Sequence, residues 1–253
     1  MHFHRPHFLH TFPPRKLWVD YLPMLLTACF IIYFAVAREQ SFIKTLPTLI
    51  TLVVQLLLVR VNRYAFLLGG TNALIYGISY FSEGLYFSLI SAVLISAPIQ
   101  YFSFFHWSKK QNKTARVLRR LSVPRLLLVL FATVAGWLGC HFALSPFFAS
   151  ASYPLLDSFL FATGITVSLL AAFCFVESQY LNIIASTISL ALWILLTIHD
   201  PKNFNYIIIS VYNLLRIIEA SVHWTKSYLA QTRAAEQKGE NAGNAALTEQ
   251  ENA

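Results

Sequence analysis

The sequence predicts an all-α integral membrane protein of eight transmembrane helices, with two parallel three-helix bundles, a linking helix and one extra N-terminal helix. Three observations lead to this fold class. Hydrophobic residues make up 57% of the 253 residues and charged residues only 12%, whereas soluble domains carry about 25% charged residues. The apolar residues are gathered into eight long segments, and the basic residues lie mostly on one side of them. A water-soluble enzyme is excluded, because too few polar residues remain to cover its surface.

Each apolar segment approaches the length of about 20 residues with which a helix crosses a bilayer. The eight predicted spans are residues 19–37, 42–59, 64–80, 85–105, 123–143, 155–176, 180–198 and 204–224. Most links between them are short and hold charges, Gly or Pro, which forces neighbouring helices to be antiparallel. The second span contains Lys44 and Pro47; a proline near a helix start is tolerated, because its missing N–H would be unpaired there.

The orientation follows from the basic residues. Only Arg38, Lys44 and Lys202 fall on one side of the predicted spans. Fifteen of the nineteen fall on the other side: Arg5, Arg15, Lys16, Arg60, Arg63, Lys109, Lys110, Lys113, Arg116, Arg119, Arg120, Arg125, Lys226, Arg233 and Lys238. Since cytoplasmic loops carry the excess of Lys and Arg, both termini are expected in the cytoplasm of a multi-pass protein of the plasma (inner) membrane. The net charge of +8 thus marks a membrane side, and we expect the lipid bilayer and no nucleic acid as a partner.

The remaining segments are polar. We predict a cytoplasmic leader over residues 1–18, the extra span over 19–37, a first three-helix bundle over 42–107 and a basic cytoplasmic linker over 108–122. The linking span follows over 123–143, the second three-helix bundle over 155–224 and a cytoplasmic tail over 225–253. The tail is expected to be disordered, because it is polar and has no apolar periodicity. The sequence leaves a homo-oligomer open.

An internal repeat supports the two bundles. Residues 64–107 and 180–224 have nearly the same length and the same two-span layout, and the pair His106-Trp107 corresponds to His223-Trp224. Three spans, one linking span and three more spans give two units of the same orientation. Some transporters use such a parallel repeat to build a solute site between the halves.

Polar side chains within the spans are the candidate site residues, because a charge near the bilayer centre costs about 2.5–3.5 kcal/mol and polar groups therefore face an interior path. Several recur at helical spacing. We expect a substrate site formed by Asn72, Tyr76, Tyr80, Gln100, Gln179, Asn182, Ser186, Trp193, Tyr212 and Asn213. Amides donate and accept hydrogen bonds, and the aromatic rings can stack on a ring of the solute.

Arg216 and Glu219 allow two interpretations, an ion-coupling site or a structural ion pair three residues apart on one helix. The sequence contains no GxxxxGK[ST] loop, no HExxH motif and no paired-cysteine motif, so it predicts neither an ATP-driven pump nor an enzyme. No metal, cofactor or catalytic residue is expected.

Residues 72–110 read NALIYGISYFSEGLYFSLISAVLISAPIQYFSFFHWSKK. Together with ESQYLNIIASTISLALWI at residues 177–194, this segment resembles the PnuC family of vitamin transporters. The similarity covers about residues 45–224. The resemblance implies two three-helix bundles joined by a linking helix, and facilitated diffusion of a vitamin that a separate kinase traps inside the cell.

The resemblance also bears on the cargo. Members similar to nicotinamide riboside carriers have two Trp and an Asn at the spacings that fall here on Gln179, Asn182 and Ser186. The expected function is import of a vitamin or nucleoside-like solute, with nicotinamide riboside, thiamine, riboflavin and a deoxynucleoside as candidates. The alternatives are an ion-coupled nucleoside transporter and a membrane sensor or scaffold that transports nothing.

Overall fold

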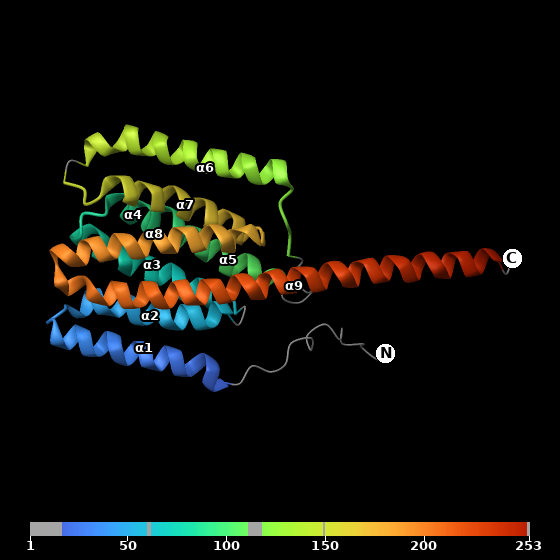
Figure 1. Ribbon diagram of the computed structural model, residues 1–253, viewed down its shortest axis with the longest axis horizontal. Helices are drawn as coiled ribbons and strands as arrows, with labels where there is room; N and C mark the ends of the chain where they lie inside the picture. Colours follow the sequence, from blue (N-terminus) through green and yellow to red (C-terminus); the bar gives the residue numbers. More distant parts are fainter. Residues whose placement is uncertain (1–16, 60–61, 111–117, 149, 252–253) are drawn as a thin grey trace.

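The computed structural model describes residues 17–59, 62–110, 118–148 and 150–251, and the elements in this part of the chain are helices (Figure 1). Residues 1–16 of the predicted leader lie outside it. The helices are α1 (Leu17–Ala37), α2 (Phe42–Val59), α3 (Tyr64–Ser82), α4 (Tyr86–Ile90), a π-helix (Ser91–Ser96), α5 (Ala97–Lys110), α6 (Val123–Leu144), α7 (Pro154–Ala172), α8 (Glu177–His199) and α9 (Phe204–Glu251). Two 3₁₀ turns, Ser145–Phe147 and Pro201–Asn203, precede α7 and α9.

The helices have the apolar character of membrane spans. In the described chain, five are long and apolar enough to cross a membrane: Tyr86–Phe105, Val123–Phe147, Pro154–Ala172, Glu177–His199 and Pro201–Gln237. Tyr21–Ala37 and Phe42–Leu58 are shorter apolar helices. Helix α3 is long enough but less apolar, because it carries glycines, tyrosines and Asn72. The predicted all-helical, multi-pass membrane protein is thus confirmed.

The helices run side by side, with α1 at one edge of the bundle and α6 at the other (Figure 1). Helix α1 packs on α2 and α9, α3 packs on α2 and α5, and α8 packs between α7 and α9. We call the end at which α2 meets α3 and α7 meets α8 the basic end, since the linker with Arg119 and Arg120 reaches it. The opposite end holds the links from α1 to α2, from α3 to α4 and from α8 to α9.

Local sequence signals explain several helix ends. Pro154 opens α7 at a position where the missing N–H would be unpaired. Gly84 ends the turn after α3 with φ of 68°, a conformation that glycine adopts without a Cβ clash. Its carbonyl accepts a hydrogen bond from Ser152 N at 3.0 Å, which joins the α3–α4 turn to the chain before α7.

The hydrophobic core lies toward the opposite end. It consists of Ile31, Leu52, Leu85, Leu192, Trp193, Leu196, Tyr206, Ile209 and Tyr212, with Tyr76 and Tyr80 packed against it. The rings of Trp193 and Tyr206 stack with centroids 4.0 Å apart. Aromatic pairs of this kind contribute about 0.5–1.5 kcal/mol beyond the area they bury. This half of the bundle is therefore filled by side chains from α1, α2, α3, α8 and α9.

Two predicted boundaries differ from the structure. The tail expected to be disordered is instead helical, since α9 continues without a break to Glu251 (Figure 1). Its alanines, glutamines and glutamates favour helix, and extending an existing helix avoids the cost of nucleation. Helix α7 ends at Ala172, not Val176, because the chain turns at Cys174, where φ is 63°.

Candidate functional site

A cavity of about 480 Å³ lies between the helices and is the candidate site. Solute sites commonly measure 300–1,000 Å³. Its lining comes from α2, α3, α4, the π-helix, α5, α7, α8 and α9. On α8 the lining runs from Gln179 to Ser189 and on α9 from Ile217 to Trp224, so the cavity occupies the part of the bundle toward the basic end.

Most of the predicted site residues meet at this cavity. Helices α3, α5 and α8 supply them, although these residues are up to 114 positions apart in the chain (72 to 186). Those that line it are Asn72, Tyr76, Tyr80, Gln100, Gln179, Asn182 and Ser186. The stripes of polar residues on separate helices therefore converge.

Three predicted site residues lie outside the cavity lining. Trp193 is 5% exposed and packs behind Tyr80, in the stack with Tyr206. Tyr212 is buried in the core, where its hydroxyl accepts a hydrogen bond from Arg216 Nε at 3.2 Å. Asn213 does not line the cavity either, and its Oδ1 is buried with no hydrogen-bond partner among the described residues. A helical stripe does not reveal which of its members a neighbouring helix will cover.

Arg216 and Glu219 form an ion pair within α9, with 2.8 Å between Nη1 and Oε2. The guanidinium also lies 5.3 Å from the ring centroid of Tyr212. Neither residue lines the cavity. This geometry fits the interpretation as a structural pair, because Glu219 neutralises the buried charge of Arg216 on the same helix.

Asn72 is held in place by α2. Its amide nitrogen donates to Pro47 O at 3.1 Å and to Thr51 Oγ1 at 2.9 Å. Thr51 Oγ1 in turn lies 3.3 Å from the hydroxyl of Tyr76. The side chain of Asn72 is 5% exposed, and its Oδ1 has no partner among the described residues. Both amide hydrogens are thus occupied, so Asn72 positions Thr51 and Tyr76 and keeps only an acceptor free.

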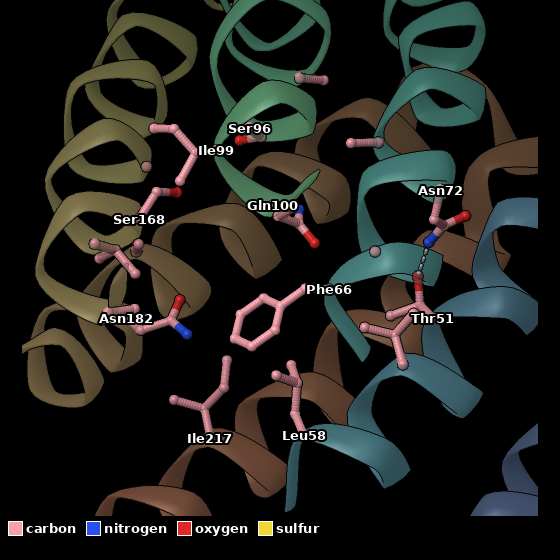
Figure 2. A pocket seen from close by; sticks show the side chains of 18 of the residues that line it. Thr51, Leu58, Phe66, Asn72, Ser96, Ile99, Gln100, Ser168, Asn182 and Ile217 are labelled. Atoms are coloured by element: carbon pink, nitrogen blue, oxygen red, sulfur yellow. Dashed lines mark hydrogen bonds between the residues drawn. The ribbon is translucent and has the colours of Figure 1, made fainter. Parts of the chain in front are cut away.

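Gln100 and Asn182 differ from Asn72. Neither amide has a hydrogen-bond partner in the part of the chain that the structure describes. Figure 2 shows them facing the same space from α5 and α8, with the ring of Phe66 between Asn182 and Thr51. An amide that lines a cavity with its donors and acceptor unused can recognise a polar solute.

Phe66 and Gly69 are cavity residues that were not predicted. They lie toward the cavity side of α3 with Asn72, since Gly69 precedes Asn72 by about one turn and Phe66 precedes it by about two. Extending the predicted stripe toward the helix start would have found both. The serines of the π-helix, Ser91 and Ser96, also line the cavity, and such π-segments often occur at functional sites.

The lining carries no formal charge in the described chain. It contains amides, hydroxyls, rings and aliphatic side chains, but no Asp, Glu, Lys, Arg or His. Among the described residues, no group of three or more His, Cys, Asp or Glu side chains could hold a metal ion. The described lining therefore offers hydrogen-bonding groups and aromatic rings to a solute, but no charged side chain.

Comparison with known proteins places these observations in a family. A family model described as nicotinamide mononucleotide transporter matches residues 41–226, which include every described residue that lines the cavity. No curated protein matches the chain significantly.

A solved structure has the same fold. It is the crystal structure of the vitamin B3 transporter PnuC, with 18% sequence identity and a TM-score of 0.73. The alignment covers 87% of this chain and 95% of that one. Helix α1 precedes the residues that the family model matches. The resemblance noted from the sequence is thus confirmed, and the chain belongs to the PnuC family of nicotinamide mononucleotide transporters.

Proposed function

We propose that this protein imports a nicotinamide riboside-like nucleoside across the inner membrane by facilitated diffusion, and that the cavity is its binding site. The observation that carries the proposal is an uncharged, amide-lined cavity in a member of this family. The vitamin B3 transporter with the same fold supports the class of cargo. A separate kinase would then trap the nucleoside inside the cell.

A nucleoside fits the lining better than a mononucleotide. A phosphate group in a buried site needs charged partners such as Arg or Lys, and desolvating it without them is costly. The described lining offers none. A pyridinium ring, in contrast, can lie against the rings of Tyr76 and Tyr80, because aromatic faces attract cations.

The proposed architecture is the parallel repeat. In this proposal the first three-helix unit consists of α2, α3 and the continuous helix formed by α4, the π-helix and α5. Helices α7 to α9 form the second unit, and α6 links the two. The cavity draws its lining from both units and from neither α1 nor α6 in the described chain, which supports a solute site at their interface. The basic end faces the cytoplasm in this proposal, since the excess of Lys and Arg lies there.

Uptake by purified protein in liposomes tests the cargo. Labelled nicotinamide riboside should enter down its gradient and stop at equilibrium, and the mononucleotide should enter far more slowly. Accumulation of unmodified riboside above equilibrium would show ion coupling. Thermal-shift measurements with riboside, thiamine, riboflavin and deoxynucleosides rank the cargoes, because a ligand of the native state stabilises it by mass action. If none shifts the melting curve and none enters, a sensor or scaffold role replaces the proposal.

Two amide variants test the site. Asn182→Ala and Gln100→Ala should each raise the KM for riboside by about tenfold, the effect of losing one hydrogen bond to the solute. Asn213→Ala is the matched control, because this amide does not line the cavity. If all three variants transport like the wild type, the solute binds elsewhere.

A further inference from the structure

The cavity ends short of the opposite end of the bundle. Toward the opposite end it stops at Tyr80 and Ser88, and beyond them the core side chains of α8 and α9 fill the bundle. Trp193 and Tyr206, 5% and 0% exposed, stack behind Tyr80. A solute that crosses the protein must pass this packed half, so something at the opposite end has to separate.

A buried polar cluster lies at that end, and Glu83 is its centre. Glu83 follows α3, and its Oε1 pairs with Nζ of Lys44 from the start of α2. Its Oε2 accepts a hydrogen bond of 2.7 Å from Nδ2 of Asn203, the last residue before α9. The side chains of Lys44 and Glu83 are only 19% and 9% exposed, and Asn203 is fully buried.

A second bond runs parallel to the first. Asn205, in the first turn of α9, donates from Nδ2 to Oε1 of Gln40 in the link between α1 and α2. Asn205 is 1% exposed. Two hydrogen bonds therefore hold the start of α9. One joins it to Glu83 at the end of α3, and the other joins it to Gln40 in the link before α2. We call Lys44, Glu83, Asn203, Asn205 and Gln40 the outer cluster.

The outer cluster is incompletely satisfied. Among the described residues, Gln40 Nε2, Asn203 Oδ1 and Asn205 Oδ1 are buried without a hydrogen-bond partner. Each unpaired buried polar group destabilises the closed arrangement, because it has lost its hydrogen bonds to water without replacing them. Opening the cluster would let water bind these atoms. The free energy gained in this way offsets part of the free energy lost when the Asn203–Glu83 and Asn205–Gln40 bonds break. Such an arrangement suits a contact that must form and break, more than one that only supports the fold.

We propose that the outer cluster is the outer gate of the transporter, and that the structure is its inward-facing state. In this state, Asn203 and Asn205 hold α9 against α2 and α3, and we infer that the solute reaches the cavity from the basic end. Access from outside requires Asn203 to leave Glu83 and Asn205 to leave Gln40. This inference rests on the proposed function for its meaning in transport, but the closure itself can be measured without any solute.

Thiol accessibility tests the gate. The background carries serine in place of Cys29, Cys140 and Cys174, and Ser189→Cys adds one thiol to the cavity lining. A membrane-impermeant maleimide is added to right-side-out or inverted vesicles. Without further changes, the thiol should react fast from the cytoplasmic side and slowly from outside.

Loosening the cluster should change only the outside reaction. Asn203→Ala or Asn205→Ala should speed labelling from outside by about fivefold, which corresponds to losing about 1 kcal/mol of one net hydrogen bond. Asn213→Ala, an α9 amide outside the cluster, should leave both rates unchanged. Glu83→Gln keeps an acceptor for Asn203 and should have a smaller effect than Asn203→Ala.

The outcomes separate this inference from the proposed function. Faster outside labelling in the cluster variants, in protein that transports no riboside, would support the gate and reject the cargo. Unchanged outside labelling in both asparagine variants, with unchanged melting temperature, would overturn the gate even if riboside is transported. If Asn203→Ala does not fold, the rate at which the cavity thiol of Asn205→Ala is labelled from outside tests the gate.

Discussion

Gly69 and Gln100 are packed so closely that a Cβ on Gly69 would overlap the side-chain oxygen of Gln100. The glycine on α3 thus makes room for the amide of Gln100 from α5, which lines the cavity beside it. No other residue type leaves this space, because every other side chain begins with a Cβ. The position of the Gln100 amide therefore depends on a residue that has no side chain of its own.

Gly69→Ala should weaken solute binding by displacing Gln100. We expect the KM for riboside to rise by about tenfold, the effect of one lost hydrogen bond, with a much smaller change in the maximal rate. Liposome uptake measures both constants. Gly136→Ala is the matched control, because a Cβ on that α6 glycine meets nothing within 4 Å. Gly69→Ala combined with Gln100→Ala should be no worse than Gln100→Ala alone; a fully additive effect would contradict the packing argument.

Gly84→Ala should lower stability with little direct effect on binding. Its φ of 68° is unfavourable for alanine by about 1–2 kcal/mol, and the new Cβ would lie 3.1 Å from Ser150 O. For a chain of this size, each 1 kcal/mol lowers the melting temperature by about 2–4 °C. Thermal unfolding of purified protein checks this. Gly139→Ala serves as the control, since open space surrounds that glycine; equal melting temperatures of the two variants would refute the prediction.

Thr51→Val should loosen the contact between α2 and α3. The hydroxyl accepts from the Asn72 amide at 2.9 Å, and its loss leaves a buried donor unpaired. We expect a destabilisation of about 1–3 kcal/mol, seen as a lower melting temperature, together with an altered KM because Asn72 is released. Thr187→Val provides the comparison, because in the described part of the chain its hydroxyl bonds only to Ile183 O of its own helix. If both valine variants melt alike, Asn72 does not depend on Thr51.

Glu177→Ala should release the linker from the basic end. Glu177 Oε1 accepts a hydrogen bond from Leu121 N at 3.1 Å and lies 3.8 Å from Arg120 Nε. Without it, we expect trypsin to cut after Arg120 about fivefold faster, because cleavage follows the population of the open segment. The fragments are identified by mass spectrometry. Glu177→Gln keeps an acceptor oxygen and should be cut at nearly the wild-type rate, and an equal rate for both variants would exclude the role of this bond.

Local signals identified the spans well and the tail poorly. Apolar length is a property of each segment alone, so the eight predicted apolar segments reappear as helices, most with small shifts at their ends, whereas α9 continues to Glu251. The prediction of a disordered tail is wrong, because polar composition alone does not prevent a helix. Residues 225–251 continue a helix that is already formed, and for such an extension helix propensity matters more than hydrophobicity.

Packing between distant segments decided which polar residues face the cavity. Trp193 and Tyr212 are polar-tipped aromatic residues at helical spacing, like Tyr76. However, Trp193 stacks on Tyr206, and both Trp193 and Tyr212 are buried in the hydrophobic core. The bond from Asn203 to Glu83 joins residues 120 positions apart. No periodicity within one helix predicts such a bond.

The sequence alone determined that this is an all-helical membrane protein, where its apolar helices lie, the family resemblance and most of the amides at the cavity, because hydrophobic length and helical spacing are local quantities. Only the tertiary structure decided that Gln100 lies over Gly69, that Trp193 belongs to the core and that Glu83 holds the start of α9. These relationships depend on how far two helices approach each other. The side chains of both helices set that distance together, so it cannot be predicted from the sequence of either helix alone.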